Sequence, residues 1–286
     1  MAGGDPAAAA RMDTSAPSGR NLLLRILSAL VLAPLAIGVT YWGGWAFAVF
    51  WGVAALAVWW EWVRLVDPQG SNGALVLGAS ALVLEALLAA SGRVDRALLI
   101  ILLALFGIAV TATRHGKWMV GGIVYASALV IAPVLIRADE EFGLLAILLL
   151  FAIVWSTDIG GYFGGRILGG PKLAPAISPK KTWSGAIVGT IAAVGAALAI
   201  VHWSQGGVLV PIALVAVLLS IVSQAGDLFE SSLKRRFNAK DASGLIPGHG
   251  GVMDRLDGFI IAALVAAVIG ALRGGFEHAG SGVILW

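Results

Sequence analysis

Residues 226–258 read GDLFESSLKRRFNAKDASGLIPGHGGVMDRLDG and lie between two long apolar runs. The stretch gathers lysines, arginines, carboxylates and glycines, whereas the apolar runs at 207–229 and 257–273 carry little charge. A run of about 20 apolar residues is long enough to cross a bilayer as a helix. The stretch therefore predicts a polar loop between two membrane helices, and its concentration of charge needs a functional explanation.

The composition of the whole chain favours a membrane protein. Of its 286 residues, 59% are hydrophobic and only 12% are charged, and the mean hydropathy is +0.93. Soluble domains carry roughly 25% charged residues. The chain has no cysteine, which excludes disulfides and thiolate metal sites. The pI is near 9.4, but the net charge is only +3 and the basic residues fall in short loops, so nucleic acid is not an expected partner.

The apolar runs predict an all-α, polytopic membrane helix bundle with about nine transmembrane helices. Residues 1–21 are small and polar and predict a disordered tail. Residues 22–141 would form the N-terminal membrane helices, and residues 142–286 a catalytic membrane region with polar loops at 162–182 and 230–256. The expected spans lie at 22–41, 44–65, 72–91, 95–113, 118–136, 142–161, 183–202, 207–229 and 257–273.

The basic residues also predict an orientation. If the N-terminus is cytoplasmic, the 19 lysines and arginines fall on cytoplasmic segments, apart from Arg93, Arg96, Arg137 and Arg273. Cytoplasmic loops are enriched in lysine and arginine, so this split favours a cytoplasmic N-terminus and a C-terminus on the other side. Tryptophans near the inner ends of the spans are consistent with an aromatic belt at the interface, namely Trp59, Trp60, Trp62, Trp118 and Trp183.

Polar residues in 226–258 follow a helical spacing. Asp227, Glu230 and Lys234 stand at i, i+3 and i+7, so a helix would place them on one face together with Ser231. Carboxylates hold Mg²⁺, and basic side chains hold phosphates. A mixture of the two suits phosphoryl or nucleotidyl transfer.

The simpler interpretation is a loop whose basic residues only fix the topology. It leaves unexplained the carboxylates at the membrane ends of apolar helices, Asp227, Asp254 and Asp257. An intramembrane carboxylate costs about 2.5–3.5 kcal/mol on insertion scales, and such residues usually serve a function.

A second polar segment, residues 155–184, reads WSTDIGGYFGGRILGGPKLAPAISPKKTWS. Asp158 lies near the inner end of an expected span. The glycine pairs 160–161 and 164–165 predict close packing against another helix. Lys180 and Lys181 precede the next span together with Ser178, where they indicate either a phosphate site or a topology signal.

Three further residues have ordinary structural interpretations beside functional ones. His249 in PGHGG is either a proton carrier or phosphate ligand, or a plain polar loop residue. Glu61 and Glu85, inside the second and third expected spans, are expected to form hydrogen bonds within the bundle rather than to take part in catalysis.

The stretch from Ser231 to Gly258 resembles the signature of the phosphatidate cytidylyltransferases, also called CDP-diacylglycerol synthases. That signature has Ser-x-x-Lys-Arg, then Lys-Asp, a Pro-x-His-Gly-Gly turn and Asp-Arg-x-Asp, and every part is present. The segment 155–184 also fits, and together the resemblance covers about residues 155–260. One departure is Ser184, where the family usually has glutamate after SPKKTW.

The resemblance implies transfer of the cytidylyl group of CTP to phosphatidic acid, giving CDP-diacylglycerol and pyrophosphate in phospholipid biosynthesis. It implies catalytic roles for Asp227, Asp254, Lys234 and Lys240. It also implies a two-metal Mg²⁺ site on Asp227, Asp254, Asp257 and Glu230. The substrate-binding residues would be Asp158, Ser178, Lys180, Lys181, Ser231, Ser232, Arg235, His249 and Arg255.

The expected setting is a bacterial inner membrane, with the active site facing the cytoplasm and lipids around the bundle; a homodimer is one arrangement that the sequence allows. Two alternatives stay open. A CTP-dependent lipid kinase would transfer the γ-phosphate of CTP instead. An ion-coupled transporter would place charges near the midplane of several spans, whereas here they cluster at one face.

Overall fold

The computed structural model describes residues 19–68, 72–111, 115–204, 208–246 and 250–286, with side chains from residue 30 onward. Ten helices and two short strands form in these residues. They are α1 (Gly19–Trp42), α2 (Gly44–Val66), α3 (Asn72–Ala90), α4 (Val94–Thr111), α5 (Gly116–Arg137), α6 (Gly143–Leu168), β1 (Lys172–Ala174), β2 (Ser178–Thr182), α7 (Trp183–Ser204), α8 (Leu209–Arg236), α9 (Met253–Gly274) and α10 (Ala279–Ile284).

Eight helices, α2 to α9, are long and apolar enough to cross a membrane. The chain is therefore a multi-pass membrane protein built almost wholly of helices, as the sequence predicts. The first expected span, 22–41, coincides with α1, of which the part with described side chains, Leu30–Trp42, is a shorter apolar helix. The tail expected over residues 1–21 lies almost wholly outside the described residues.

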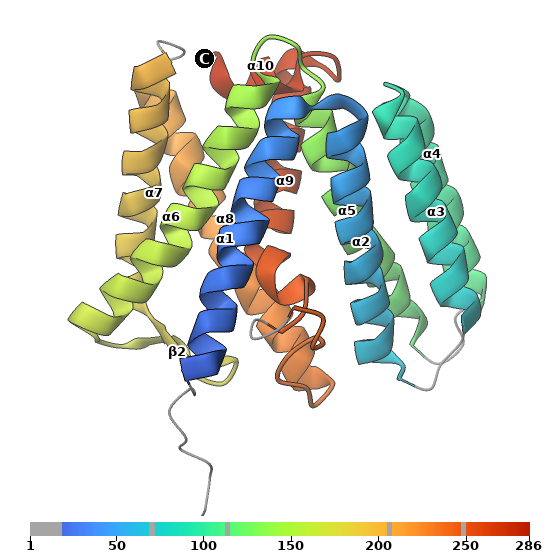
Figure 1. Cartoon of the computed structure of the whole chain (residues 1–286), viewed down its shortest axis with the longest axis horizontal. Helices are drawn as coiled ribbons and strands as arrows, with labels where there is room; N and C mark the ends of the chain where they lie inside the picture. The colour runs from blue at the N-terminus through green and yellow to red at the C-terminus, as the bar shows by residue number, and fades with distance from the viewer. Residues whose placement is uncertain (1–18, 69–71, 112–114, 205–207, 247–249) are drawn as a thin grey trace, which may run out of the picture.

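The helices lie side by side as one bundle (Figure 1). The β-strands and the α8–α9 connection lie at the end of the bundle where α1 begins, and α10 lies at the opposite end (Figure 1). The two expected polar loops therefore share one end of the molecule. The division at residue 141 stays a prediction, because α5 packs against α9 as well as against α2, α3 and α4.

Both polar loops differ from the prediction in their limits. Helix α6 continues to Leu168, so the first part of the loop expected at 162–182 is helical. Helix α8 continues to Arg236 and α9 begins at Met253, so the second loop is shorter than 230–256.

The prediction of helices alone is wrong at one place, because β1 and β2 form an antiparallel hairpin. Gly169 and Gly170 have φ angles of 61° and 101°, a left-handed conformation that ends α6 and turns the chain. Lys172 then pairs with Thr182, and Ala174 with Ser178. The hairpin holds the second lysine-rich segment close to the end of α6.

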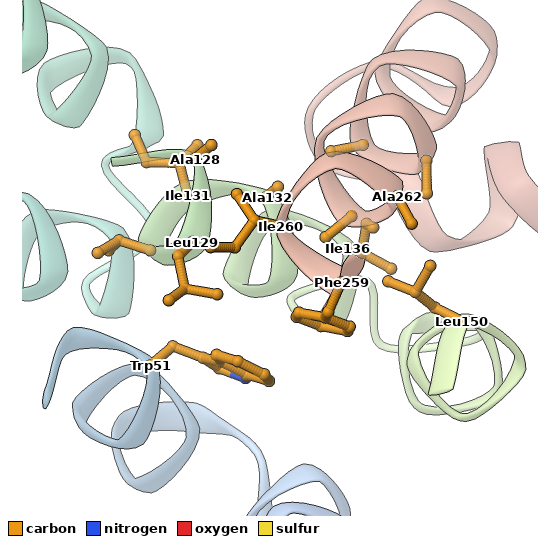
Figure 2. Close-up of a cluster of buried hydrophobic side chains, with 14 of the residues drawn as sticks. Trp51, Ala128, Leu129, Ile131, Ala132, Ile136, Leu150, Phe259, Ile260 and Ala262 are labelled. Carbon is orange, nitrogen blue, oxygen red and sulfur yellow. The ribbon is translucent and has the colours of Figure 1, made fainter. Parts of the chain in front are cut away.

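The core of the bundle surrounds α5, in which nearly every residue from Gly122 to Ile136 is buried. The ring of Trp51 on α2 stacks on Phe259 of α9, with centroids 4.7 Å apart (Figure 2). Aromatic contact of this kind joins the N-terminal helices to α9.

Two of the tryptophans assigned to an interfacial belt are core residues instead. Trp59 and Trp62 are 0% and 1% exposed. Their indole N–H groups donate to the carbonyls of Leu75 and Trp118, at 3.0 and 2.8 Å. These hydrogen bonds satisfy the polar end of each side chain inside the protein, so neither residue needs the membrane interface.

The expected close packing at the glycine pairs of α6 is confirmed. A side-chain carbon added to Gly160 would lie 3.0 Å from Gly189 Cα of α7, and one added to Gly164 would lie 2.5 Å from Val188. In lipid no hydrophobic force drives two helices together, so their association depends on close packing. Small residues allow α6 and α7 to pack closely. This contact sets the position of Asp158 on α6 relative to the start of α7.

Candidate functional site

A polar cavity of about 630 Å³ lies at the end of the bundle that holds the hairpin and the α8–α9 loop. Helices α6, α7, α8 and α9 and strand β2 all contribute to its wall. Nine of the site residues expected from the sequence line it: Asp158, Lys180, Lys181, Asp227, Glu230, Lys234, Asp254, Arg255 and Asp257. The fold thus brings both charged segments to a single place.

Asp227 joins α8 to the hairpin. Its carboxylate forms an ion pair with Lys181 at the end of β2. It also accepts a hydrogen bond of 3.4 Å from Ser231 Oγ, one turn further along α8. The helical stripe predicted from the spacing is therefore present, and Asp227 of this stripe contacts the lysine-rich segment.

Lys234 lies between two carboxylates. Its Nζ atom is 2.6 Å from Glu230 Oε2 and 2.5 Å from Asp254 Oδ1. The Glu230 and Asp254 side chains are only 1% and 5% exposed. Buried charges of this kind are tolerated when they are paired, and removing one partner leaves an uncompensated charge.

The carboxylate of Asp254 also organises the loop before α9. Asp254 Oδ2 accepts hydrogen bonds from the backbone N–H groups of Gly251, at 2.7 Å, and Ala242, at 3.0 Å. With Lys234 on Oδ1, both oxygens of Asp254 are engaged. Asp254 therefore links α8, the loop and the first turn of α9.

Asp158, Asp227 and Asp257 form an acidic region of the cavity, close enough for their charges to repel one another. Lys181 and Arg255 offset this repulsion at Asp158. Across the described residues, no group of three or more histidine or carboxylate side chains is placed to hold a metal ion.

The other site residues expected from the sequence do not line the cavity. Among the described ones these are Ser178, Ser231, Ser232, Arg235 and Lys240. Ser232 donates to Phe229 O on its own helix, Arg235 donates to Ala239 O, and Lys240 is exposed. His249 lies outside the described residues.

Several cavity residues were not among the site residues expected from the sequence. Arg166 and Tyr162 line the cavity four residues apart and share a hydrogen bond of 3.0 Å. Tyr162 lies one turn after Asp158, and Arg166 one turn after Tyr162, so extending the expected helix past residue 161 would have indicated both. Gln224 lines the cavity too, and its amide donates to the hydroxyls of Thr190 and Ser220, at 3.2 and 3.3 Å.

Ser184, which stands where the family usually has glutamate, does not line the cavity. Its hydroxyl donates to the carbonyl of Gly169 and lies 3.0 Å from Thr182 Oγ1. The side chain thereby ties the start of α7 to the end of α6.

Comparison with known proteins extends the likeness well beyond the polar segments. The model of the Cytidylyltransferase family matches residues 23–272. The phosphatidate cytidylyltransferases of Brucella suis biovar 1 (strain 1330) and Brucella melitensis biotype 1 (strain ATCC 23456) are 44% and 45% identical to the chain. Each match spans 258 residues, 88% of this chain and 94% of the relative.

A third relative, the phosphatidate cytidylyltransferase of Haemophilus influenzae, is 43% identical over 140 residues, which is 46% of this chain and 45% of that protein. The Brucella matches extend over the N-terminal helices, where the sequence motifs alone carried no likeness.

Proposed function

The chain belongs to the cytidylyltransferase family, and we propose that it transfers the cytidylyl group of CTP to phosphatidic acid, producing CDP-diacylglycerol and pyrophosphate. The observation that carries the proposal is the joining of lysines and carboxylates in one cavity at one end of a membrane bundle. A phosphate-rich nucleotide and a lipid phosphate can meet at such a place.

The reaction needs no covalent intermediate with the protein. A phosphate oxygen of phosphatidic acid attacks the α-phosphorus of CTP, and the bond from that phosphorus to the pyrophosphate oxygen breaks. Two anionic substrates must therefore be held together in line against their mutual repulsion. Lys180, Lys181 and Arg255 supply cationic donors in the cavity, and charge-assisted hydrogen bonds to phosphate are among the stronger ones.

Magnesium fits the acidic region. Mg²⁺ is usually bound by one or two carboxylates together with water and substrate phosphates, rather than by a complete protein cage. We propose Asp227 and Asp257 as its protein ligands, with Asp158 nearby. Glu230 and Asp254 share the nearly buried Lys234, whereas Asp227 pairs with Lys181 at a more open place, where the two side chains are 32% and 28% exposed and the pair can separate. Bound there, the ion would neutralise the charge that develops on the phosphates.

Lys181 has a second task in this proposal. Its ion pair with Asp227 balances charge between β2 and α8 before any substrate binds. The same ammonium group is within the cavity and can exchange the carboxylate for a phosphate oxygen. Positioning and charge neutralisation of this sort account for most of the catalysis of phosphoryl-group chemistry.

The proposed setting is the bacterial inner membrane, with the cavity on the cytoplasmic side, the N-terminus on that side and the C-terminus on the other. The distribution of lysine and arginine supports this orientation. A C-terminal reporter that is active only in the cytoplasm should stay inactive.

A homodimer is a further part of the proposal. The mass of the detergent-solubilised protein tests whether it forms.

The decisive experiment assays the purified protein with CTP, phosphatidic acid and Mg²⁺. We expect pyrophosphate to be released, and label from the α-phosphate of CTP to enter the lipid. Label entering from the γ-phosphate instead would contradict the proposal, since it would show a CTP-dependent lipid kinase.

A further inference from the structure

Glu61 is a buried acid of α2 that binds a loop remote from it in sequence. Its side chain is 0% exposed. One carboxylate oxygen, Oε1, accepts hydrogen bonds from Val252 N, at 2.8 Å, and from Ser243 Oγ. The other, Oε2, accepts from Met253 N at 2.7 Å. Three donors, two from the loop between α8 and α9 and one from the first residue of α9, thus converge on one residue of the N-terminal helices.

Two of these donors, Val252 N and Met253 N, belong to the start of α9, whose first turn needs acceptors for its backbone N–H groups. The residue before the helix, Val252, supplies no side-chain cap. Glu61 supplies that cap from another helix, and its negative charge suits the positive end of the helix dipole. The approach depends on Gly251, because a side-chain carbon there would lie 2.6 Å from Glu61 Oε1.

Glu61 and Asp254 bind the loop at the same two places. At the first, Ser243 Oγ donates to Glu61 and the neighbouring Ala242 N donates to Asp254. At the second, Val252 and Met253 donate to Glu61, and Gly251 N donates to Asp254. The loop is therefore clamped between a carboxylate of α2 and a carboxylate of α9.

We infer that Glu61 is a positioning residue, which fixes the loop and the first turn of α9 so that Asp254 and Lys234 keep their places in the cavity. Asp254 directly follows Met253, and it holds Lys234 at 2.5 Å. Glu61 itself does not line the cavity. Its effect on turnover rests on the proposed function, whereas its effect on the loop does not.

The first test measures the loop directly. The chain has no cysteine, so a nitroxide on Leu245→Cys, a loop position that is 49% exposed, would be its only spin label. In Glu61→Gln the amide N–H₂ group would face backbone N–H donors and could not accept their hydrogen bonds, so the loop should become more mobile. We expect this greater mobility to narrow the lines of the electron paramagnetic resonance spectrum. Glu85→Gln is the matched control: it alters a buried acid on α3 and should leave the spectrum unchanged.

The second test measures turnover of unlabelled protein. Glu61→Gln should lower kcat about 10- to 100-fold, the loss that follows a displacement of catalytic groups by about 1 Å. The KM for CTP should change much less, because Lys180 and Lys181 are held by the hairpin. If Glu61→Gln yields no folded protein, Ser243→Ala removes only one donor and should show both effects in weaker form.

The outcomes separate the two proposals. A folded Glu61→Gln protein with a mobile loop and unchanged kcat would overturn the positioning role. Reduced kcat with an unchanged spectrum would overturn the clamp as its cause. If the wild-type protein formed no CDP-diacylglycerol, the proposed function would fail, and the spectra would still decide whether Glu61 holds the loop.

Discussion

Lys234 of α8 binds Asp254 of α9 at 2.5 Å, and the two side chains are only 12% and 5% exposed. The same ammonium lies 2.6 Å from Glu230, so one cation serves two nearly buried carboxylates. Helices α8 and α9 are thereby joined electrostatically at the point where both enter the cavity. The strength of this ion-pair network depends on Lys234, Glu230 and Asp254 together, because all three are too buried to exchange a lost partner for water.

The first prediction concerns this ion-pair network. Lys234→Gln should leave Glu230 and Asp254 buried beside each other without a cation, and removing one partner of a buried pair costs about 3–5 kcal/mol. We expect a lower unfolding temperature and a large loss of turnover. Lys117→Gln, at an exposed lysine outside the cavity, is the control and should change neither.

A double variant distinguishes a network from two independent contributions. Asp254→Asn should also lose most turnover, because it weakens the hold on Lys234 and on the loop. If the residues act as a unit, the double variant should be hardly worse than either single variant. If the fold-losses of turnover in the two single variants multiplied in the double variant, Lys234 and Asp254 would act independently and the prediction would be wrong.

The second prediction concerns the proposed metal ligand Asp227. Asp227→Asn keeps the shape of the side chain but loses the charge that attracts Mg²⁺. Turnover should therefore fall at every Mg²⁺ concentration and recover in part at the highest ones. Asp67→Asn, at an acid that follows α2 and does not line the cavity, serves as the control. Wild-type turnover of Asp227→Asn at low Mg²⁺ would remove this residue from the metal site.

Much of the site could be predicted because local spacing determines it. Asp227, Glu230 and Lys234 share a helix face at any tertiary arrangement, since 3.6 residues per turn places i, i+3 and i+7 together. The same holds for Asp254 and Asp257 on α9. The clustering of charge between apolar runs then predicted that both polar segments lie at the same end of the bundle, where the cavity is found.

The missing parts depend on contacts that no local pattern records. Glu61 was expected to form hydrogen bonds inside the bundle, and it does, but its partners Val252 and Met253 lie at the start of α9, 191 and 192 residues away in sequence. Trp59 and Trp62 lie where an interfacial belt would place them, yet they face backbone carbonyls inside the protein. The hairpin was missed because two glycines end α6 seven residues later than the hydropathy suggests.

The third prediction concerns pH and the opposite end of the bundle. Asp139, between α5 and α6, is 1% exposed and accepts backbone hydrogen bonds from Glu141, Phe142 and Ser281. Burial alone would raise the pKa of Asp139, but these hydrogen bonds outweigh it and lower the pKa below its ordinary value of 3.8. The contact joins the start of α6 to α10.

A lowered pKa in the folded state stabilises the protein above the unfolded value, and that contribution disappears as pH falls through the folded pKa. Asp139→Asn should therefore lower the unfolding temperature at pH 7 relative to wild type. The difference should shrink as pH falls below about 3.8. Glu140→Gln, at an exposed neighbour, is the control. A difference that did not vary with pH would show that the charge of Asp139 is not what stabilises the contact.

The last prediction uses two glycines of α7 whose surroundings differ. A side-chain carbon on Gly189 would lie 2.6 Å from the carbonyl oxygen of Thr157 on α6, whereas one on Gly195 would meet nothing within 4 Å. Gly189→Ala should therefore push α6 and α7 apart and destabilise the protein by about 1–3 kcal/mol, the usual cost of overpacking. Gly195→Ala should be neutral or slightly stabilising, because alanine restricts the unfolded chain.

Turnover should respond as stability does, with a loss in Gly189→Ala and no loss in Gly195→Ala. Asp158 on α6 directly follows Thr157, and Lys181 precedes α7, so a wider α6–α7 spacing would separate residues that line the cavity together. We expect Gly189→Ala to lower both the unfolding temperature in detergent and the turnover of the folded fraction, and Gly195→Ala to change neither turnover nor yield. Equal behaviour of the two variants would mean that the α6–α7 contact does not control the geometry of the cavity.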